Sequence, residues 1–172
     1  IRIRYIEPVD SNLYEESRTD LLEKIASKNT TIDVCNISLP NELSGPMLPP
    51  VPLYINEIIK EVLKAERDGC DAVIIGCCSD PGLPEAQRAA NIPVVGPLQA
   101  AAATVAGRGL RLGVLCPDEH AWKTTANWLR ANLRYYGLDD VVGPIRFVPM
   151  HSEGETGELV GNTDLSAEDI DK

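Results

Sequence analysis

The chain has 172 residues, of which 44% are hydrophobic and 24% charged, a composition ordinary for a globular protein and too apolar for intrinsic disorder. Its 16 Lys and Arg residues against 26 Asp and Glu residues give a net charge of −10, which disfavours nucleic acid and membrane surfaces as partners. No apolar run reaches the ~18–20 residues that a membrane helix requires. The 5 cysteines are an odd number and favour reduced thiols in a cytoplasmic protein over a disulfide framework.

The two ends of the chain predict that the sequence is a fragment. Residue 1 is Ile rather than Met, and Ser166 with Asp169 three residues later has the pattern of a helix start close to Lys172. We therefore expect the C-terminal part of a longer protein to be missing.

Strands and helices alternate through the first half. In chain order, the expected elements are a strand over Ile1–Pro8, a helix over 12–28, a strand over Thr31–Ile37, a Pro-rich loop over Pro40–Pro52, a helix over Leu53–Arg67, a strand over Asp71–Cys77, a short helix over Glu85–Ala90 and a strand over Ile92–Val95. The apolar run Ala72–Ile75 is typical of a strand buried on both faces.

The apolar spacing of the first two helices predicts their inner faces. The first would bury Leu13, Leu21, Leu22 and Ile25, and the second would bury Ile55, Ile58, Ile59 and Val62.

The second half repeats the alternation, with a helix over Leu98–Ala106, a strand over Leu110–Cys116, a helix over His120–Tyr136 and a strand over Ile145–Val148. Such alternation predicts an α/β protein with parallel sheets and right-handed crossovers, doubly wound as two pseudo-symmetric flavodoxin-like lobes. Gly96-Pro97 is the expected seam, which gives an N-terminal lobe over 1–97 and a second, incomplete lobe over 98–172.

Ligands of open parallel sheets bind outside the carboxyl ends of the strands. The segments at that edge are Glu7–Asn12, Ser38–Pro50, Gly76–Gly82 and Cys116–His120. From these, Pro8, Asp10, Cys78, Ser79 and Cys116 are the candidate substrate-binding residues, and Cys77 is the candidate catalytic residue.

The densest of these segments surrounds Cys77. Gly76 would let the backbone pass close to a ligand, and the amides of Cys78 and Ser79 could form a small anion-binding nest. A partly exposed thiol among aligned N–H groups has a pKa lowered from about 8.5 towards neutrality, which makes it a base or a nucleophile.

Simpler interpretations of the same residues stay open. Most cysteines that end a core strand are packing residues, and Asp80 before Pro81 and Gly82 could only cap a turn. A zinc site from Cys77, Cys78 and His120 is disfavoured, because adjacent cysteines fit tetrahedral ligation poorly. The sequence has no phosphate loop, no dinucleotide fingerprint and no nucleophile elbow.

At Gly76–Leu83 the sequence resembles the hydantoin racemase branch of the aspartate/glutamate racemase superfamily, whose members show Gly-Cys-Phe-x-Asp-Pro-Gly-Leu after a buried strand. The resemblance continues in Ile92–Pro97, in Ala100–Ala103, in Ser44-Gly45-Pro46 and in Arg134–Leu138, and so covers residues 1 to about 150.

This resemblance implies racemisation of a cyclic amide, such as a 5-substituted hydantoin or allantoin, without a cofactor or a metal. Cys77 would be one of two cysteines on opposite faces of the stereocentre, and the second is expected beyond Lys172. The amides of Cys78 and Ser79 would stabilise the enolate oxygen. A small-molecule substrate and a homo-oligomer are also implied.

Two departures from the family pattern point to altered specificity. Glu7-Pro8-Val9-Asp10 replaces Asn-Pro-Asn-Thr, and Cys116-Pro117-Asp118 stands where many members have Thr. A related thiol-dependent decarboxylase, a cis–trans isomerase and a catalytically silent metabolite-binding protein remain alternatives.

Overall fold

A computed structural model describes residues 1–12, 15–39, 51–117 and 119–148 of the chain. Leu13, most of the predicted Pro-rich loop with Ser44-Gly45-Pro46, Asp118 and the predicted helix start at Ser166 lie outside these residues. The chain divides into two compact units, Ile1–Ala103 and Thr104–Lys172, and each is described by itself.

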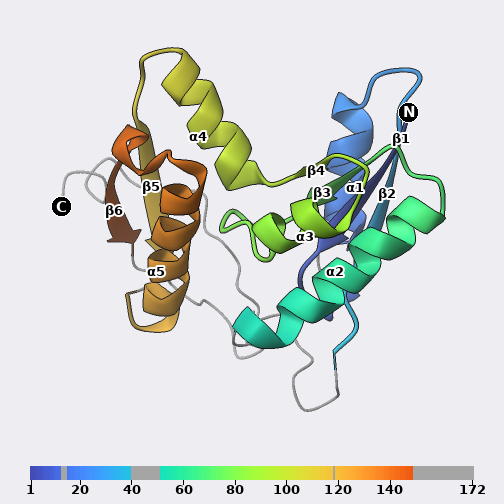
Figure 1. Ribbon diagram of the computed structural model, residues 1–172, viewed down its shortest axis with the longest axis horizontal. Helices are drawn as coiled ribbons and strands as arrows, with labels where there is room; N and C mark the ends of the chain where they lie inside the picture. Colours follow the sequence, from blue (N-terminus) through green and yellow to red (C-terminus); the bar gives the residue numbers. More distant parts are fainter. Residues whose placement is uncertain (13–14, 40–50, 118, 149–172) are drawn as a thin grey trace. The chain divides into compact units, whose positions relative to one another are not determined.

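The first unit contains the elements from β1 through most of α4 (Figure 1). In chain order they are β1 (Arg2–Glu7), α1 (Glu15–Ile25), β2 (Thr31–Asn36), α2 (Val51–Arg67), β3 (Ala72–Ile75), α3 (Leu83–Ala89), β4 (Val94–Val95) and α4 (Pro97–Gly107). The predicted α/β class with parallel strands is confirmed, because all strand pairs of this unit are parallel.

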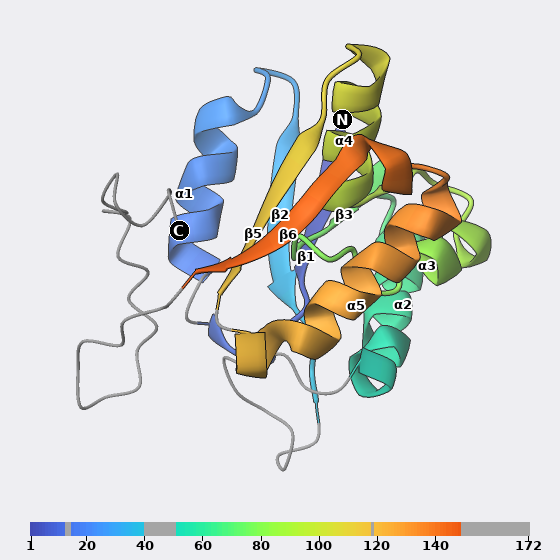
Figure 2. The ribbon, with the colours of Figure 1, turned by 90° about the vertical axis from the view of Figure 1, so that its left-hand side faces the viewer.

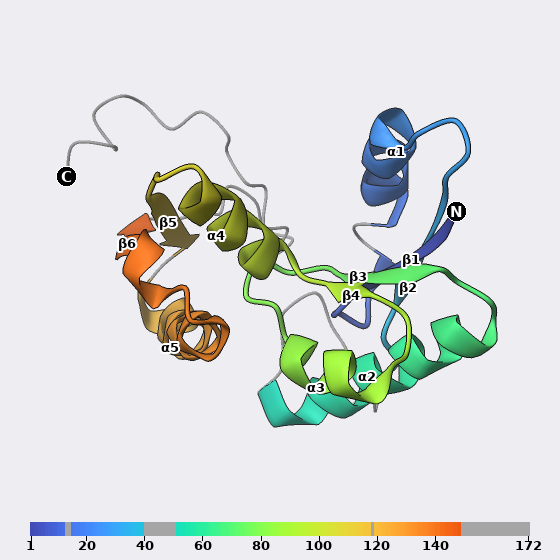
Figure 3. The same ribbon diagram turned by 45° about the horizontal axis from the view of Figure 1, so that its top comes forward.

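The strand order of the first sheet is β2-β1-β3-β4, which places β1 and β3 side by side in its centre. Their register pairs Ile6 with Ile75, so Glu7 and Gly76 both lie where the two strands end. Figure 3 shows α1 on one face of this sheet and α2 with α3 on the other. Successive residues of β1 therefore face different helices.

The core of the first unit confirms part of the predicted helix faces. Helix α2 buries Ile58 and Val62 as predicted, and it also buries Tyr54, whose ring the apolar spacing did not include. In α1 only Leu22 is buried, whereas Leu21 is 51% and Ile25 is 70% exposed, so the predicted face of that helix is wrong. The apolar spacing in α1 therefore does not identify the residues that this helix buries.

The strand β3 also differs from its prediction. Val73 and Ile75 are fully buried, whereas Ala72 and Ile74 are only partly buried. The strand therefore has one fully buried and one partly buried face, so the predicted burial is complete only on the face of Val73 and Ile75.

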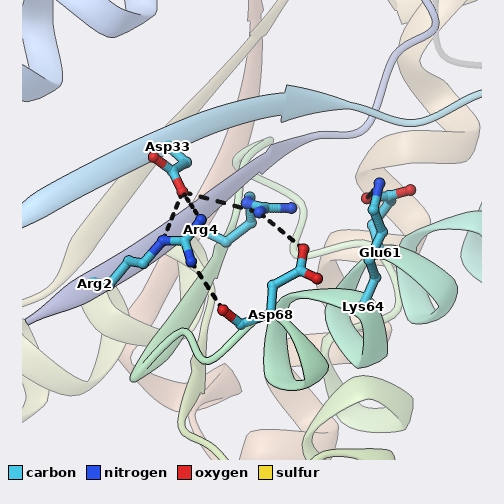
Figure 4. Close-up of polar contacts among 6 residues, drawn as sticks. All are labelled: Arg2, Arg4, Asp33, Glu61, Lys64 and Asp68. Carbon is cyan, nitrogen blue, oxygen red and sulfur yellow. Dashed lines mark hydrogen bonds and ion pairs between the residues drawn. The ribbon is translucent and has the colours of Figure 1, made fainter.

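A polar network joins β1 to β2 and to the end of α2 (Figure 4). Arg2 contacts the Asp33 carboxylate at 2.8 Å, and the buried Arg4 contacts Asp68 at 3.4 Å. Because Asp33 and Asp68 remain partly exposed, their charges stay hydrated while they balance Arg4. The network lies towards the N-terminal ends of β1 and β3, opposite to the ends at which Glu7 and Gly76 lie.

The second unit pairs two parallel strands, β5 (Leu112–Pro117) and β6 (Val142–Val148), with a register irregularity between Leu112 and Val114. Between them the chain forms α5 (Glu119–Tyr136) and the short 3-10 helix η2 (Asp139–Val141), and Figure 2 shows α5 beside the two strands. Helix α5 buries Ala126, Leu129 and Leu133, which share one face. In the described part of the chain, no helix is long and apolar enough to cross a membrane.

Candidate functional site

The loop that follows β3 stays attached to β1 after the strand has ended. The Gly76 N–H donates to the Ile6 carbonyl oxygen at 2.7 Å. A Cβ at Gly76 would lie 2.8 Å from the Tyr5 hydroxyl and 2.9 Å from the Ile6 oxygen, closer than real Cβ atoms approach. Position 76 therefore requires glycine because β1 approaches it closely, whereas the sequence analysis expected a ligand to do so.

Cys77 adopts a backbone conformation that side chains rarely adopt. Its φ is +64°, and Asp80 in the same loop has a φ of +52°. A left-handed conformation costs a non-glycine residue roughly 1–2 kcal/mol, although Asp tolerates it better than most. Strain of this kind persists only where the surrounding contacts impose it, and it is concentrated at functional sites.

The Cys77 thiol is held by Ser79, two residues further along the loop. Cys77 Sγ lies 3.1 Å from Ser79 Oγ, and the backbone N–H of Ser79 also hydrogen-bonds the sulfur. Ser79 is itself buried, with 2% of its surface exposed. The Ser79 amide, which was predicted to face a ligand anion, therefore hydrogen-bonds the Cys77 sulfur. That sulfur carries the negative charge when Cys77 loses its proton.

The predicted direction of the Cys77 pKa was wrong. Burial raises the pKa of this thiol above its ordinary value, and the nearby Cys78 and Glu7 raise it further. The two hydrogen bonds from Ser79 act in the opposite direction and lower the pKa without cancelling the effect of burial. The sequence showed the N–H donors but could not show how far the side chain is withdrawn from water.

Asp80 has a larger structural role than the predicted turn cap. Its fully buried carboxylate accepts the backbone N–H of Leu98 at 2.8 Å and that of Gln99 at 2.7 Å, in the first turn of α4. A carboxylate at a helix N-terminus satisfies amides that have no partner within the helix. A Cβ at Gly96 would collide with this carboxylate, which explains the glycine there.

A cluster of polar side chains lies next to the thiol loop, and of its members the sequence analysis had named only Glu7. Glu7, at the end of β1, is 7% exposed and pairs with Arg18 of α1, with 3.3 Å between Oε2 and Nε. The Arg18 guanidinium lies over the Tyr5 ring, 5.7 Å from its centre. Burial raises the pKa of Glu7, whereas Arg18 and a hydrogen bond with Tyr5 lower it. Only the alternation of β1 could have indicated that Tyr5 and Glu7 share a face.

The other predicted site residues occupy different environments. Cys78 is exposed and Pro8 is fully buried. The Asp10 carboxylate accepts the backbone N–H of Leu39 at 2.9 Å and so joins the segments that follow β1 and β2. Cys116 is buried at the end of β5 and belongs to the second unit. Among the predicted site residues, Cys77 and Ser79 lie in direct contact with each other.

The described residues include no group of three His, Cys, Asp or Glu side chains placed to hold a metal ion.

Comparison with known proteins gives a family for the chain. The profile of the Asp/Glu/hydantoin racemase family matches residues 20–171. A hydantoin racemase of Paenarthrobacter aurescens is 33% identical over 103 residues, which are 59% of this chain and 43% of that protein. The chain therefore spans less than half the length of this curated relative.

Solved structures show the same fold. An allantoin racemase from Klebsiella pneumoniae superposes with a TM-score of 0.67 at 19% identity, over 87% of this chain and 59% of that one. An allantoin racemase from Pseudomonas fluorescens gives a TM-score of 0.70 at 22% identity, over 86% of this chain and 60% of that one. At this level of identity the likeness concerns the arrangement of strands and helices.

Proposed function

Because the chain belongs to the Asp/Glu/hydantoin racemase family, we propose that it supplies a catalytic thiol, that of Cys77, to a cofactor-independent racemase of cyclic amides. The proposed substrates are 5-substituted hydantoins or allantoin, since the names of the relatives to which the chain is similar refer to hydantoin and to allantoin. The observation that carries the proposal is Cys77 itself. It follows a central strand, has a left-handed backbone and is hydrogen-bonded through its sulfur to Ser79.

The proposed reaction begins with a proton transfer. The Cys77 thiolate takes the proton from the carbon next to the ring carbonyl, and the electron pair of that C–H bond moves into the carbonyl to give an enolate. The sulfur becomes a thiol, whose proton exchanges with solvent while the enolate persists. A proton delivered to the opposite face of the carbon inverts it, whereas return of the first proton restores the original configuration.

Neighbouring groups have defined parts in this proposal. The Ser79 hydroxyl and amide stabilise the thiolate before it reacts, since both are donors to the sulfur. The exposed Cys78 is the proposed source of an N–H for the enolate oxygen. Asp80 fixes the loop to α4, so that these donors keep their direction through the reaction.

Exchange of the α-proton in D2O tests the proposal directly. The chain would be incubated with the L and D forms of a 5-substituted hydantoin and of allantoin, and exchange followed by NMR and by optical rotation. We expect exchange above the buffer rate for at least one substrate, and its loss in the Cys77→Ser variant. Exchange with racemisation indicates a proton donor on each face, and exchange with retained configuration indicates Cys77 alone.

The matched control is Cys35→Ser, the same change at a cysteine of β2. It should leave the exchange rate unchanged, with circular dichroism showing that both variants are folded. Exchange that persists in Cys77→Ser would overturn the assignment of the base, and absence of exchange with all substrates would overturn the proposed reaction.

A further inference from the structure

The end of β1 carries a carboxylate that is almost completely removed from water. Glu7 is 7% exposed, and its charge is balanced by Arg18, which reaches it from α1 at 3.3 Å. An ionised carboxylate is costly to bury without such a partner. The Glu7–Arg18 pair is therefore screened less by water than an ion pair on the surface, which contributes little to stability.

The position of this pair relative to the thiol follows from the sheet. The β1–β3 register pairs Ile6 with Ile75, so the next residues along the two strands are Glu7 and Gly76, and Cys77 follows directly. Tyr5 links the ion pair to the thiol loop, because its hydroxyl lies next to Gly76 and the Arg18 guanidinium lies over its ring. A charge on Glu7 thus acts electrostatically on the thiol, in a region that is largely removed from water.

We propose that Arg18 is a positioning residue for Cys77, which acts by pairing with Glu7 and offsetting the carboxylate charge that stands beside the thiol. Without Arg18, formation of a thiolate at Cys77 would place a second negative charge next to an unbalanced first one. This inference rests on the proposed function only in taking Cys77 as the base.

The groups that act on Cys77 come from several elements. Glu7 and Cys78 raise the pKa of the thiol, Ser79 lowers it, and burial contributes most. Tyr54 of α2 also interacts electrostatically with Cys77, and burial, with Cys77 as the smaller cause, raises the pKa of its hydroxyl. The Glu7 charge raises the pKa of Cys77, and a single neutral substitution removes it without altering the Ser79 bonds.

The pH dependence of thiol alkylation tests the proposal without requiring turnover of any substrate. Every variant would carry Cys78→Ser, and the rate of iodoacetamide reaction at Cys77 would be followed by mass spectrometry between about pH 8 and 10, where a thiolate forms. In Arg18→Gln we expect a rate about three- to tenfold lower at a fixed pH, which corresponds to a pKa higher by about half to one unit. In Glu7→Gln we expect the rate to rise by a similar factor.

Two further variants separate charge from structure. Arg18→Lys should keep the rate near that of the unsubstituted residue, since it keeps the charge, and Arg67→Gln makes the same neutral change at the far end of α2 and should have no effect.

Equal pH profiles in Arg18→Gln and the unsubstituted chain would overturn the proposal, as would a slower reaction in Glu7→Gln. The second result remains decisive if Arg18→Gln does not fold. If these shifts occur and no α-proton exchange is found, the proposed reaction fails and the role of Arg18 stands.

Discussion

The carboxylate of Asp80 accepts the backbone N–H of Leu98 at 2.8 Å, so the loop that carries the thiol also closes the first turn of α4. We expect Asp80→Ala to lower the free energy of unfolding by at least about 2 kcal/mol, because the buried amide of Leu98 and the partly buried amide of Gln99 lose a carboxylate acceptor. Urea unfolding measures this loss. Asp20→Asn, at an exposed position of α1, should change it by less than about 0.5 kcal/mol, and a similar loss in both variants would contradict the cap.

The contact between Gly76 and β1 predicts a second difference in stability. Gly76→Ala would push a methyl group against the Tyr5 hydroxyl and the Ile6 carbonyl, and it should cost about 2–3 kcal/mol. Gly107→Ala makes the same change at the end of α4, where nothing lies within 4 Å, and should be neutral or stabilising by up to about 1 kcal/mol. Thermal or urea unfolding of the two variants distinguishes the crowded position from the open one.

The bond from Ser79 predicts a change in thiol reactivity. Because its hydrogen bonds lower the pKa of Cys77, Ser79→Ala should raise that pKa and move the alkylation profile to higher pH. At pH 8 the rate should fall about three- to tenfold, the effect of half to one pKa unit. A profile that does not move would show that the hydroxyl does not stabilise the thiolate.

The buried Tyr5 predicts a loss of stability at high pH. Burial and the charge of Glu7 raise the pKa of Tyr5 to about 12, against an ordinary value near 10. The stabilisation is therefore complete below about pH 10 and is lost as the pH rises towards 12, because the unfolded chain gives up this proton first. Between about pH 9 and pH 11.5 we expect the chain to lose about 1–2 kcal/mol that Tyr5→Phe does not lose.

Urea unfolding at the two pH values measures the difference. The exposed Tyr135 is the control, and Tyr135→Phe should lose as much stability as the unsubstituted chain. An identical pH dependence in Tyr5→Phe and the unsubstituted chain would show that Tyr5 does not contribute.

The sequence predicted the order of the elements because strand and helix periods differ strongly. It also predicted the family, since Gly76–Leu83 is an uninterrupted motif whose residues needed no structure to be compared. The face of α1 was predicted wrongly because Leu21 and Ile25 fit the period of a helix and are nevertheless exposed. Periodicity shows which residues share a face, and only tertiary contacts show what covers that face.

The surroundings of Cys77 show the same limit at the site. The thiol and Ser79 are neighbours in sequence, so a local motif could place both of them. Arg18 and Glu7 are 11 residues apart and meet through the packing of α1 on β1, which no local pattern encodes. The pKa of the thiol depends on burial by those same elements, and for that reason its direction could not be predicted from the loop alone.

The backbone conformation at Cys77 favours glycine, whereas the proposed chemistry requires a cysteine at the same position. At a φ of +64° glycine is not strained, because it has no Cβ, so stability alone would favour glycine there. Cys77→Gly should accordingly be more stable to urea than Cys77→Ala, by about 1 kcal/mol, while both lack the thiol. The chain thus presents its sulfur at a position where a more durable protein would have no side chain at all.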